Sequence, residues 1–243
     1  MKHDWSNKEF KKLVTLGEST TAGGWASTRE RCWASQLARE IDECQRMPVQ
    51  LINVGIGANV ISTRSPAYPH SGKPAADERL DKHVIAHEPD LLIIAYGLND
   101  SRGGTPVDQF TECMRDIIGR VRAKIQPLVV LLGPYFMTKF DLGGATWAQG
   151  SLDRLKDFNT ATRGVADESH CLFVDLLSAY GEAPWLVHPD GVHAHDVSHR
   201  MVAHRIFDVL AANCSGLSQE TLALTASIPP WRDESTLKSD YDY

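Results

Sequence analysis

Short, continuous runs of apolar residues alternate along most of this chain with longer segments of helical periodicity. Apolar residues in these runs do not alternate with polar ones, which is typical of strands covered on both faces. The runs start about 40 residues apart, which leaves room for a crossover helix between successive strands. The pattern therefore predicts five strands, at Leu13–Leu16, Val49–Val54, Leu91–Tyr96, Leu128–Leu132 and Cys171–Leu176.

The segments between these runs carry apolar residues at the spacing of a buried helix face. One helix is predicted to start at Thr105 as its cap, with Pro106 in the first position. A later helix should begin behind Ser151, and the last one near Asp196. Alternating strands and helices predict an α/β fold with a five-stranded, mainly parallel sheet and helices on both faces. The helical stripes run from Trp33 to Cys44, Phe110 to Ile125, Leu152 to Val165 and Val202 to Leu210.

Two stretches and a tail interrupt this alternation. Ser62–Lys73, rich in Ser, Pro and His, is predicted to be a long loop, and Pro134–Gly150 mixes aromatic residues with glycine. The second stretch fits either a loop that lines a substrate site or a packed surface loop. We expect residues 1–212 to form one domain. Residues 213–243 form a tail with an acidic end, Trp231–Tyr243. We expect this tail to be either disordered or part of an interface, for example in a homo-oligomer.

Composition excludes several classes of protein. The 243 residues carry a net charge of −6, which argues against a general nucleic-acid or anionic-membrane binder. The longest apolar runs are too short to span a bilayer, and the polar N-terminus is unlike a secretory signal. Five scattered cysteines without a CxxC motif fit reduced thiols better than disulfides or a zinc site. We therefore expect a cytoplasmic protein without nucleic-acid or membrane partners.

Polar and glycine-rich segments follow four of the predicted strands. In an open parallel sheet, ligands bind outside the carboxyl ends of the strands, so these segments should lie along one edge. Together they contain a serine, a glycine-rich turn, an asparagine, an aspartate and a histidine. The segments are Gly17–Thr20 (GEST), Asn53–Asn59 (NVGIGAN), Gly97–Asp100 (GLND) and Asp190–His193 (DGVH).

These residue types together supply the groups that acyl transfer needs. A serine hydroxyl becomes a strong nucleophile when a base removes its proton, and imidazole can do so near neutral pH. An aspartate fixes the imidazole tautomer and stabilises the imidazolium. Backbone N–H groups of glycine-rich turns and an asparagine amide can stabilise the oxyanion.

The four segments, in this order, resemble the sequence blocks of the SGNH/GDSL hydrolases, from about Leu13 to Leu210. This resemblance implies a three-layer α/β/α, flavodoxin-like sandwich with esterase, lipase, thioesterase or carbohydrate-deacetylase activity and no cofactor or metal. It implies that Ser19 is the nucleophile, His193 the base and Asp190 its orienting acid. It also implies oxyanion donors from the Ser19 N–H, the Asn99 side chain and the glycine-rich segment.

The chain departs from the family pattern at two positions. Glu18 stands where the family usually has aspartate, and the longer acid is expected to hold the same local hydrogen bonds if its geometry permits. Ala58 stands where the family has the oxyanion glycine, directly after Gly57. A backbone donor survives this replacement if φ is negative. Ala58 is therefore the first candidate for the third donor, and Gly57 is the alternative.

Each segment has a simpler structural interpretation when taken alone. Ser19 could be a helix N-cap, Asn99 part of a turn, and Asp190 the first residue of an ordinary turn. The G-x-S-x-G elbow of α/β-hydrolases is absent, and the turn at Gly55–Gly57 lacks the third glycine of a dinucleotide site. The combination of four segments in order favours the serine hydrolase.

Histidines and tryptophans supply weaker candidates. His195 and His199 have a spacing compatible with a metal site, but His195 should precede the helix, so we expect no catalytic metal. Candidate pocket residues are Trp25, Trp185 and Tyr135, whereas Trp33 is assigned to the core.

The function predicted from the sequence is hydrolysis of short-chain acyl esters, small-molecule or carbohydrate, through an acyl-enzyme. Acetylated carbohydrates are included among these substrates. The alternative is a catalytically weak ligand-binding protein of the same fold, motivated by Glu18 and Ala58.

Overall fold

The sheet at the centre of the molecule is entirely parallel and has the strand order β2-β1-β3-β4-β5. We describe a computed structural model of residues 2–229 and 239. All the strands predicted from the sequence are confirmed, within a few residues at their ends. They are β1 (Lys12–Gly17), β2 (Gln50–Asn53), β3 (Leu91–Ala95), β4 (Leu128–Leu132) and β5 (Leu172–Val174).

Strand order determines where a ligand can enter. The chain runs from β1 out to the edge strand β2 and then returns to β3 on the other side of β1. The connections therefore reverse direction between β1 and β3, and this reversal opens a crevice beyond the carboxyl ends of the two strands. The flavodoxin-like sandwich expected from the sequence is confirmed.

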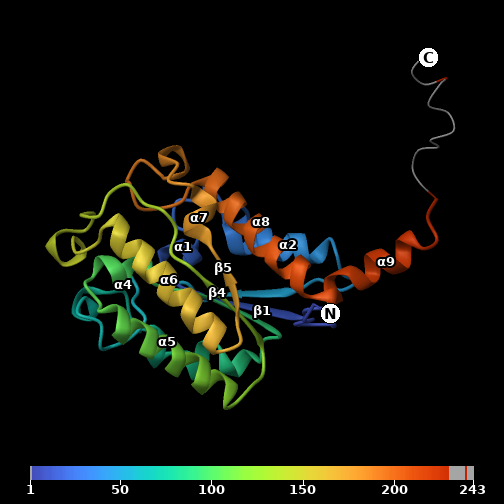
Figure 1. Cartoon of the computed structure of the whole chain (residues 1–243), viewed down its shortest axis with the longest axis horizontal. Coiled ribbons are helices and arrows are strands. Elements are labelled where there is room, and N and C mark those ends of the chain that lie inside the picture. The colour runs from blue at the N-terminus through green and yellow to red at the C-terminus, as the bar shows by residue number, and fades with distance from the viewer. Residues whose placement is uncertain (1, 230–238, 240–243) are drawn as a thin grey trace.

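Helices cover both faces of the sheet. In Figure 1, α2 (Trp33–Asp42) and α8 (Asp196–Asn213) lie on one side of the sheet, and α5 (Val107–Arg122) and α6 (Leu152–Glu168) on the other. Alternate residues of each strand point to opposite layers. In β3, Leu91 and Ile93 pack into the core under α2 and α8, whereas Leu92 and Ile94 pack into the core under α5. The short helices are α1 (Ser19–Ala22), α3 (Leu80–His83), α4 (Leu98–Arg102) and α7 (Leu176–Tyr180).

Helix starts agree with the sequence predictions in two of three cases. Ser151 caps α6 by accepting a hydrogen bond from the N–H of Arg154 at 3.1 Å, and α8 begins at Asp196 as expected. The prediction that Thr105 caps the next helix was wrong. α5 begins at Val107 without a side-chain cap. The Thr105 hydroxyl instead donates to the Asp100 carboxylate at 3.2 Å. This carboxylate is buried and cannot be hydrated, so a missing donor costs more there than at an exposed helix end.

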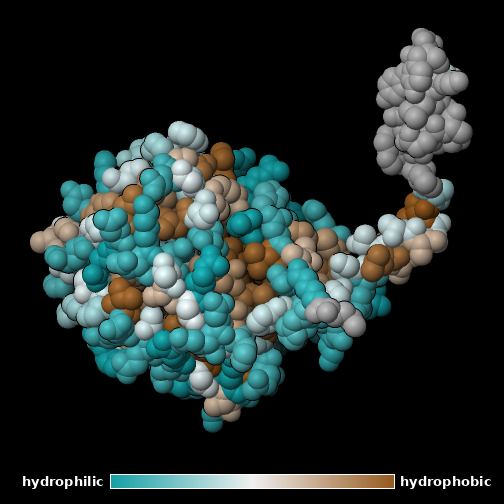
Figure 2. Space-filling view, viewed as in Figure 1, coloured by the Kyte–Doolittle hydropathy of each residue, from teal (hydrophilic) through white to brown (hydrophobic). Residues whose placement is uncertain are grey.

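Two irregular segments remain. Ser62–Lys73 is a loop with one 3₁₀ turn, Tyr68–His70, which confirms the prediction. The tail contains helix α9 (Gln219–Thr225), which projects from the domain (Figure 1). Leu222 and Leu224 of this helix are exposed, and Figure 2 shows apolar surface along the projecting segment. So short and exposed a helix leaves no buried stripe for the sequence pattern to reveal. Apart from Ser239, the acidic segment Trp231–Tyr243 lies outside the described residues.

No helix formed by residues 2–229 combines the length and the apolar character that crossing a bilayer requires.

Candidate active site

A cavity of about 330 Å³ lies at the carboxyl edge of the sheet, where the sequence predicts that four segments converge. Ser19 opens α1 directly after β1, and Asn99 lies in α4 directly after β3, so the two residues flank the crevice. Each of the four segments contributes at least one residue to the walls of this cavity, and the segment Asp190–His193 contributes its histidine. The lining residues are Ser19, Trp25, Gly57, Ala58, Asn99, Arg102, Leu142, Gly143, Trp147 and His193.

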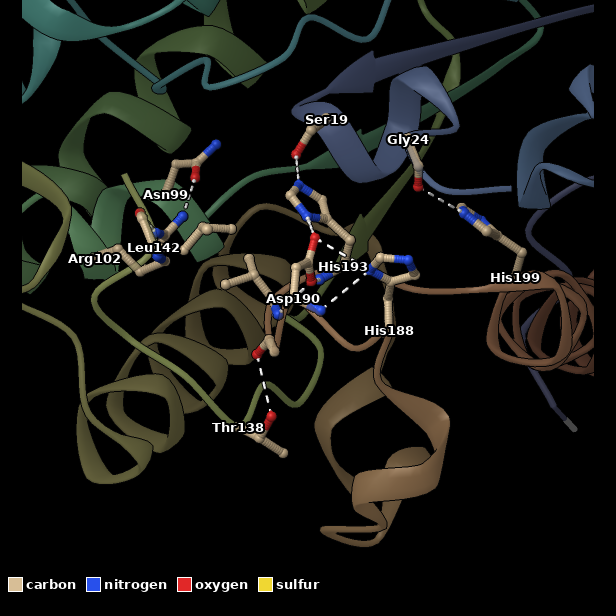
Figure 3. A network of polar contacts seen from close by, with 12 residues as sticks. Ser19, Gly24, Asn99, Arg102, Thr138, Leu142, His188, Asp190, His193 and His199 are labelled. Atoms are coloured by element: carbon tan, nitrogen blue, oxygen red, sulfur yellow. Dashed lines mark hydrogen bonds and ion pairs between the residues drawn. The ribbon is translucent and has the colours of Figure 1, made fainter. Parts of the chain in front are cut away.

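Ser19, His193 and Asp190 form a continuous chain of hydrogen bonds (Figure 3). The Ser19 Oγ lies 3.0 Å from the Nε2 atom of His193, and the Nδ1 atom of His193 lies 2.7 Å from Oδ2 of Asp190. The other carboxylate oxygen of Asp190 accepts the N–H groups of Val192 and His193 at 2.9 and 3.0 Å. The acid is therefore fixed by its own loop, and it fixes the imidazole in turn.

The charges in this chain suit a general base. Burial raises the pKa of Asp190, but the backbone donors of Val192 and His193, together with the His193 imidazole, outweigh burial and bring that pKa down to about 2. The ionised carboxylate can only accept, so the proton of neutral His193 resides on Nδ1 and leaves Nε2 free to accept from Ser19. Burial lowers the pKa of His193 below its ordinary value, and the Asp190 carboxylate only partly offsets this effect.

Glu18 joins the turn that carries Ser19 to the turn that carries Asn99. Its side chain is buried, and its two carboxylate oxygens accept the N–H groups of Gly97 and Asn99, each at 3.0 Å. Burial raises the pKa of Glu18 well above the ordinary value, an effect that these two donors oppose. The longer acid thus does hold local hydrogen bonds, because its extra methylene lets it reach the neighbouring turn.

The candidate oxyanion donors lie along one wall of the cavity. Asn99 Nδ2 donates to the carbonyl of Asn59 at 3.1 Å, and both Gly57 and Ala58 line the same space. The negative φ that we required of Ala58 is absent: its φ is +51°, in the left-handed region. An L residue pays roughly 1–2 kcal/mol for this conformation. Ala58 thus keeps the backbone conformation that glycine adopts easily, and Gly57 stays the alternative donor.

Trp25 adds an aromatic contact to the base. Its ring stacks on the His193 imidazole with 3.7 Å between centroids and 8° between planes. Trp25 has a left-handed φ of +68° and is 47% exposed. His188, which the sequence analysis did not single out, packs edge-on against Trp25, and its Nδ1 lies 3.3 Å from Oδ2 of Asp190.

Of the three candidate pocket residues, only Trp25 lies in the wall of this cavity. Trp185 is 75% exposed. Tyr135 is buried beneath α1, where its ring stacks on Tyr180, because the turn after β4 points its side chain into the core. The loop Pro134–Gly150 does contribute to the wall, through Leu142, Gly143 and Trp147. Trp33 is a core residue, as predicted.

The histidines near α8 have separate partners. His195 Nδ1 accepts the N–H of Val197, and buried His199 contacts the Trp33 N–H and the Gly24 carbonyl. His204 lies 2.8 Å from Glu40. Within residues 2–229, no three His, Cys, Asp or Glu side chains are grouped closely enough to hold a metal ion.

Arg102 is a further residue of the cavity that the sequence analysis did not select. It lies three positions after Asn99 on α4, and residues at this spacing share a helix face. That spacing is the one sequence signal that could have identified it.

Comparisons with known proteins identify the family and the fold of the chain. The model of the GDSL-like lipase/acylhydrolase family matches residues 15–201. The acetylxylan esterase Axe2 from Geobacillus stearothermophilus is similar in structure, with a TM-score of 0.65 at 17% identity, covering 84% of this chain and 96% of the esterase. A lipase/acylhydrolase from Enterococcus faecalis gives a TM-score of 0.66 at 20% identity, covering 83% and 96%. A search of curated proteins found no match.

The family match contains the Ser19 turn, the glycine-rich segment and the Asn99 turn, and it runs through His193 into α8. The two solved structures share the fold over nearly their whole length. The chain therefore belongs to the GDSL-like lipase/acylhydrolase family and is a carboxylic ester hydrolase.

Proposed function

We propose that this protein hydrolyses short-chain acyl esters through a covalent intermediate on Ser19. The observation that carries the proposal is the hydrogen-bond chain from Ser19 Oγ through His193 to Asp190, with distances of 3.0 and 2.7 Å. A nucleophile, a base and an orienting acid within hydrogen-bond reach are what nucleophilic catalysis requires.

In the acylation half-reaction, Ser19 Oγ attacks the carbonyl carbon of the ester while its proton moves to His193 Nε2. The carbonyl oxygen becomes an oxyanion, which the N–H groups of Ser19, of Ala58 or Gly57, and of the Asn99 side chain stabilise. Each such donor typically contributes about 10²–10³ in rate. Collapse of the tetrahedral intermediate breaks the bond to the alcohol oxygen, which leaves with the proton from His193.

Deacylation repeats these steps with water. His193 takes a proton from a water molecule, whose oxygen attacks the acyl-Ser19 ester. Collapse of the second tetrahedral intermediate releases the carboxylic acid and returns the proton from His193 to Ser19 Oγ. No metal enters either half-reaction in this proposal.

We take a small acyl group as the first candidate, because no long apolar segment of the sequence suggests an acyl channel. Trp25, Leu142 and Trp147 stand in the walls of the cavity, which has a volume of about 330 Å³. Acetyl esters are therefore the first substrates to test. The likeness to an acetylxylan esterase makes acetylated xylo-oligosaccharides a reasonable member of the test set, together with aryl acetates and longer acyl chains.

A fluorophosphonate probe tests the proposal directly, because it forms a stable bond only with an activated serine. We expect one probe per protein chain, located on Ser19 by peptide mass spectrometry. The Ser178→Ala variant, which loses an exposed hydroxyl on α7, should label like the parent protein. Absence of labelling at high probe concentration would instead favour the catalytically weak binding protein.

The pH dependence of kcat/KM should report the titration of His193. Only the neutral imidazole can accept the Ser19 proton, so activity falls as the pH drops through the pKa of His193. Burial lowers that pKa, so the midpoint of the acid limb should lie below the ordinary value of about 6.5. Asp190 opposes the effect of burial, so Asp190→Asn should move the midpoint further down while lowering the plateau. A midpoint above 6.5 in the parent enzyme would contradict this assignment.

A further inference from the structure

The amide of Asn99 has only one orientation that its neighbours permit. A guanidinium can only donate hydrogen bonds and a backbone carbonyl can only accept them. The Nη1 atom of Arg102 lies 3.3 Å from Oδ1 of Asn99, and the carbonyl of Asn59 lies 3.1 Å from Nδ2. Rotating the amide by 180° would put two donors together on one side and two acceptors on the other.

This orientation leaves one N–H bond of Asn99 for the cavity. The Asn59 carbonyl uses one of the two hydrogens on Nδ2, and the other has no partner among the described residues. Asn99 and Arg102 both lie in the wall of the cavity that holds Ser19 and His193, and Figure 3 shows Arg102 below Asn99, close to Leu142. The second hydrogen is therefore the one that an oxyanion could accept.

Arg102 is an unusual residue for this place. Its side chain is only 5% exposed, yet within residues 2–229 no carboxylate lies within ion-pair distance of it. Nη2 donates to the carbonyl of Leu142, and Nε is buried without a partner among the same residues. The carboxylates of Glu18, Asp190 and Asp141 favour the charged guanidinium only from beyond ion-pair distance. A buried charge without a direct ion-pair partner is costly, so a purely structural role does not readily explain an arginine here.

We propose that Arg102 is a positioning residue for the oxyanion site, acting through the side chain of Asn99. Its charge holds Oδ1 and so directs Nδ2 into the cavity. It also draws electron density from the amide oxygen, which strengthens the Nδ2–H group as a donor, and this effect is greatest where water is excluded. The inference rests on the proposed function, in which Asn99 stabilises the oxyanion of a serine-bound intermediate.

A double-mutant cycle tests this coupling. The kcat for an aryl acetate is measured for the parent, Arg102→Met, Asn99→Ala and the double variant, with Ser19→Ala as the floor of activity. Arg102→Met should lower kcat about 10-fold or more in the parent, with little change in KM, and Asn99→Ala about 100-fold or more. In the Asn99→Ala background, Arg102→Met should cause no further loss, because the amide through which it acts is gone.

Two further variants separate positioning from folding. Arg102→Lys keeps a charged donor and should retain more of kcat than Arg102→Met; it also serves if the methionine variant does not fold. Arg154→Met is the matched control, because Arg154 also donates to backbone carbonyls beside α4, those of Ser101 and Thr105, but does not touch Asn99. It should lower thermal stability and leave kcat within about twofold.

Several results would overturn the inference. Equal losses from Arg102→Met with and without Asn99 would show a purely structural role. A loss confined to KM and to anionic esters would show that Arg102 contacts the substrate itself. If Asn99→Ala has no effect while Ser19→Ala abolishes activity, the oxyanion role fails but the proposed function survives. Full activity of Ser19→Ala would overturn the proposed function as well.

Discussion

Ser19→Ala is expected to abolish ester hydrolysis while leaving the fold intact. Among the described residues, the hydroxyl of Ser19 hydrogen-bonds to His193 alone, so its removal costs one side-chain hydrogen bond and no backbone contact. Without the nucleophile, acylation cannot occur, and loss of such a group typically lowers kcat by about 10⁴–10⁶-fold. Any residual rate would come from direct attack by water, assisted by the oxyanion donors and by substrate binding. The measurement is hydrolysis of an aryl acetate, with circular dichroism and thermal unfolding to verify the fold.

The control for this variant is Ser178→Ala, which removes a serine hydroxyl from the exposed face of α7. It should keep the parent kcat and KM. Turnover by Ser19→Ala above about 1% of the parent, in protein purified from a host without competing esterases, would contradict the acyl-enzyme mechanism. The same variant should not react with the fluorophosphonate probe.

The parallel sheet could be predicted from the sequence because its central strands, β1, β3 and β4, are largely buried on both faces. A run such as Leu91–Tyr96 consists of apolar residues and alanine or tyrosine, without the alternating polar positions of a strand that is exposed on one face. It is also too short to be one of the helices that cover a sheet. Helix starts were harder. Thr105 has the right type and place for a cap, but the tertiary contact with buried Asp100 competes for its hydroxyl, and that contact is invisible in the local sequence.

The candidate site could be predicted in outline because parallel strands bring their carboxyl ends to one edge. This rule alone places Ser19 near Asn99, although 80 residues separate them. It does not say which way a loop side chain points, and Tyr135, a candidate pocket residue, lies buried outside the wall of this cavity. Arg102 was not identified because an arginine on a short helix is usually solvated, and only the packing of the loop around Leu142 buries it.

The two departures from the family pattern have different local consequences. Glu18 accepts two N–H groups of the Asn99 turn and so links that turn to the one that carries Ser19. Ala58 adopts a left-handed conformation, which glycine reaches more easily. Its positive φ does not meet the condition under which we expected its N–H to serve as an oxyanion donor, so the choice between Ala58 and Gly57 stays open.

His193→Ala should be nearly as damaging as loss of the nucleophile, because the two residues act as one unit. Without the imidazole, the proton of Ser19 has no acceptor within reach, and kcat should fall by about 10⁴-fold or more. The double variant with Ser19→Ala should be no slower than either single variant.

Added imidazole provides the sharper test of His193. The space left by the side chain is bounded on one face by the ring of Trp25, so free imidazole can stack there and accept the proton. It should restore part of the activity of His193→Ala and none of the activity of Ser19→Ala. His204→Ala, which removes a half-exposed histidine paired with Glu40 on α2, is the control and should leave kcat unchanged. Normal turnover by a folded His193→Ala variant would show that another group, with His188 the nearest imidazole, serves as the base.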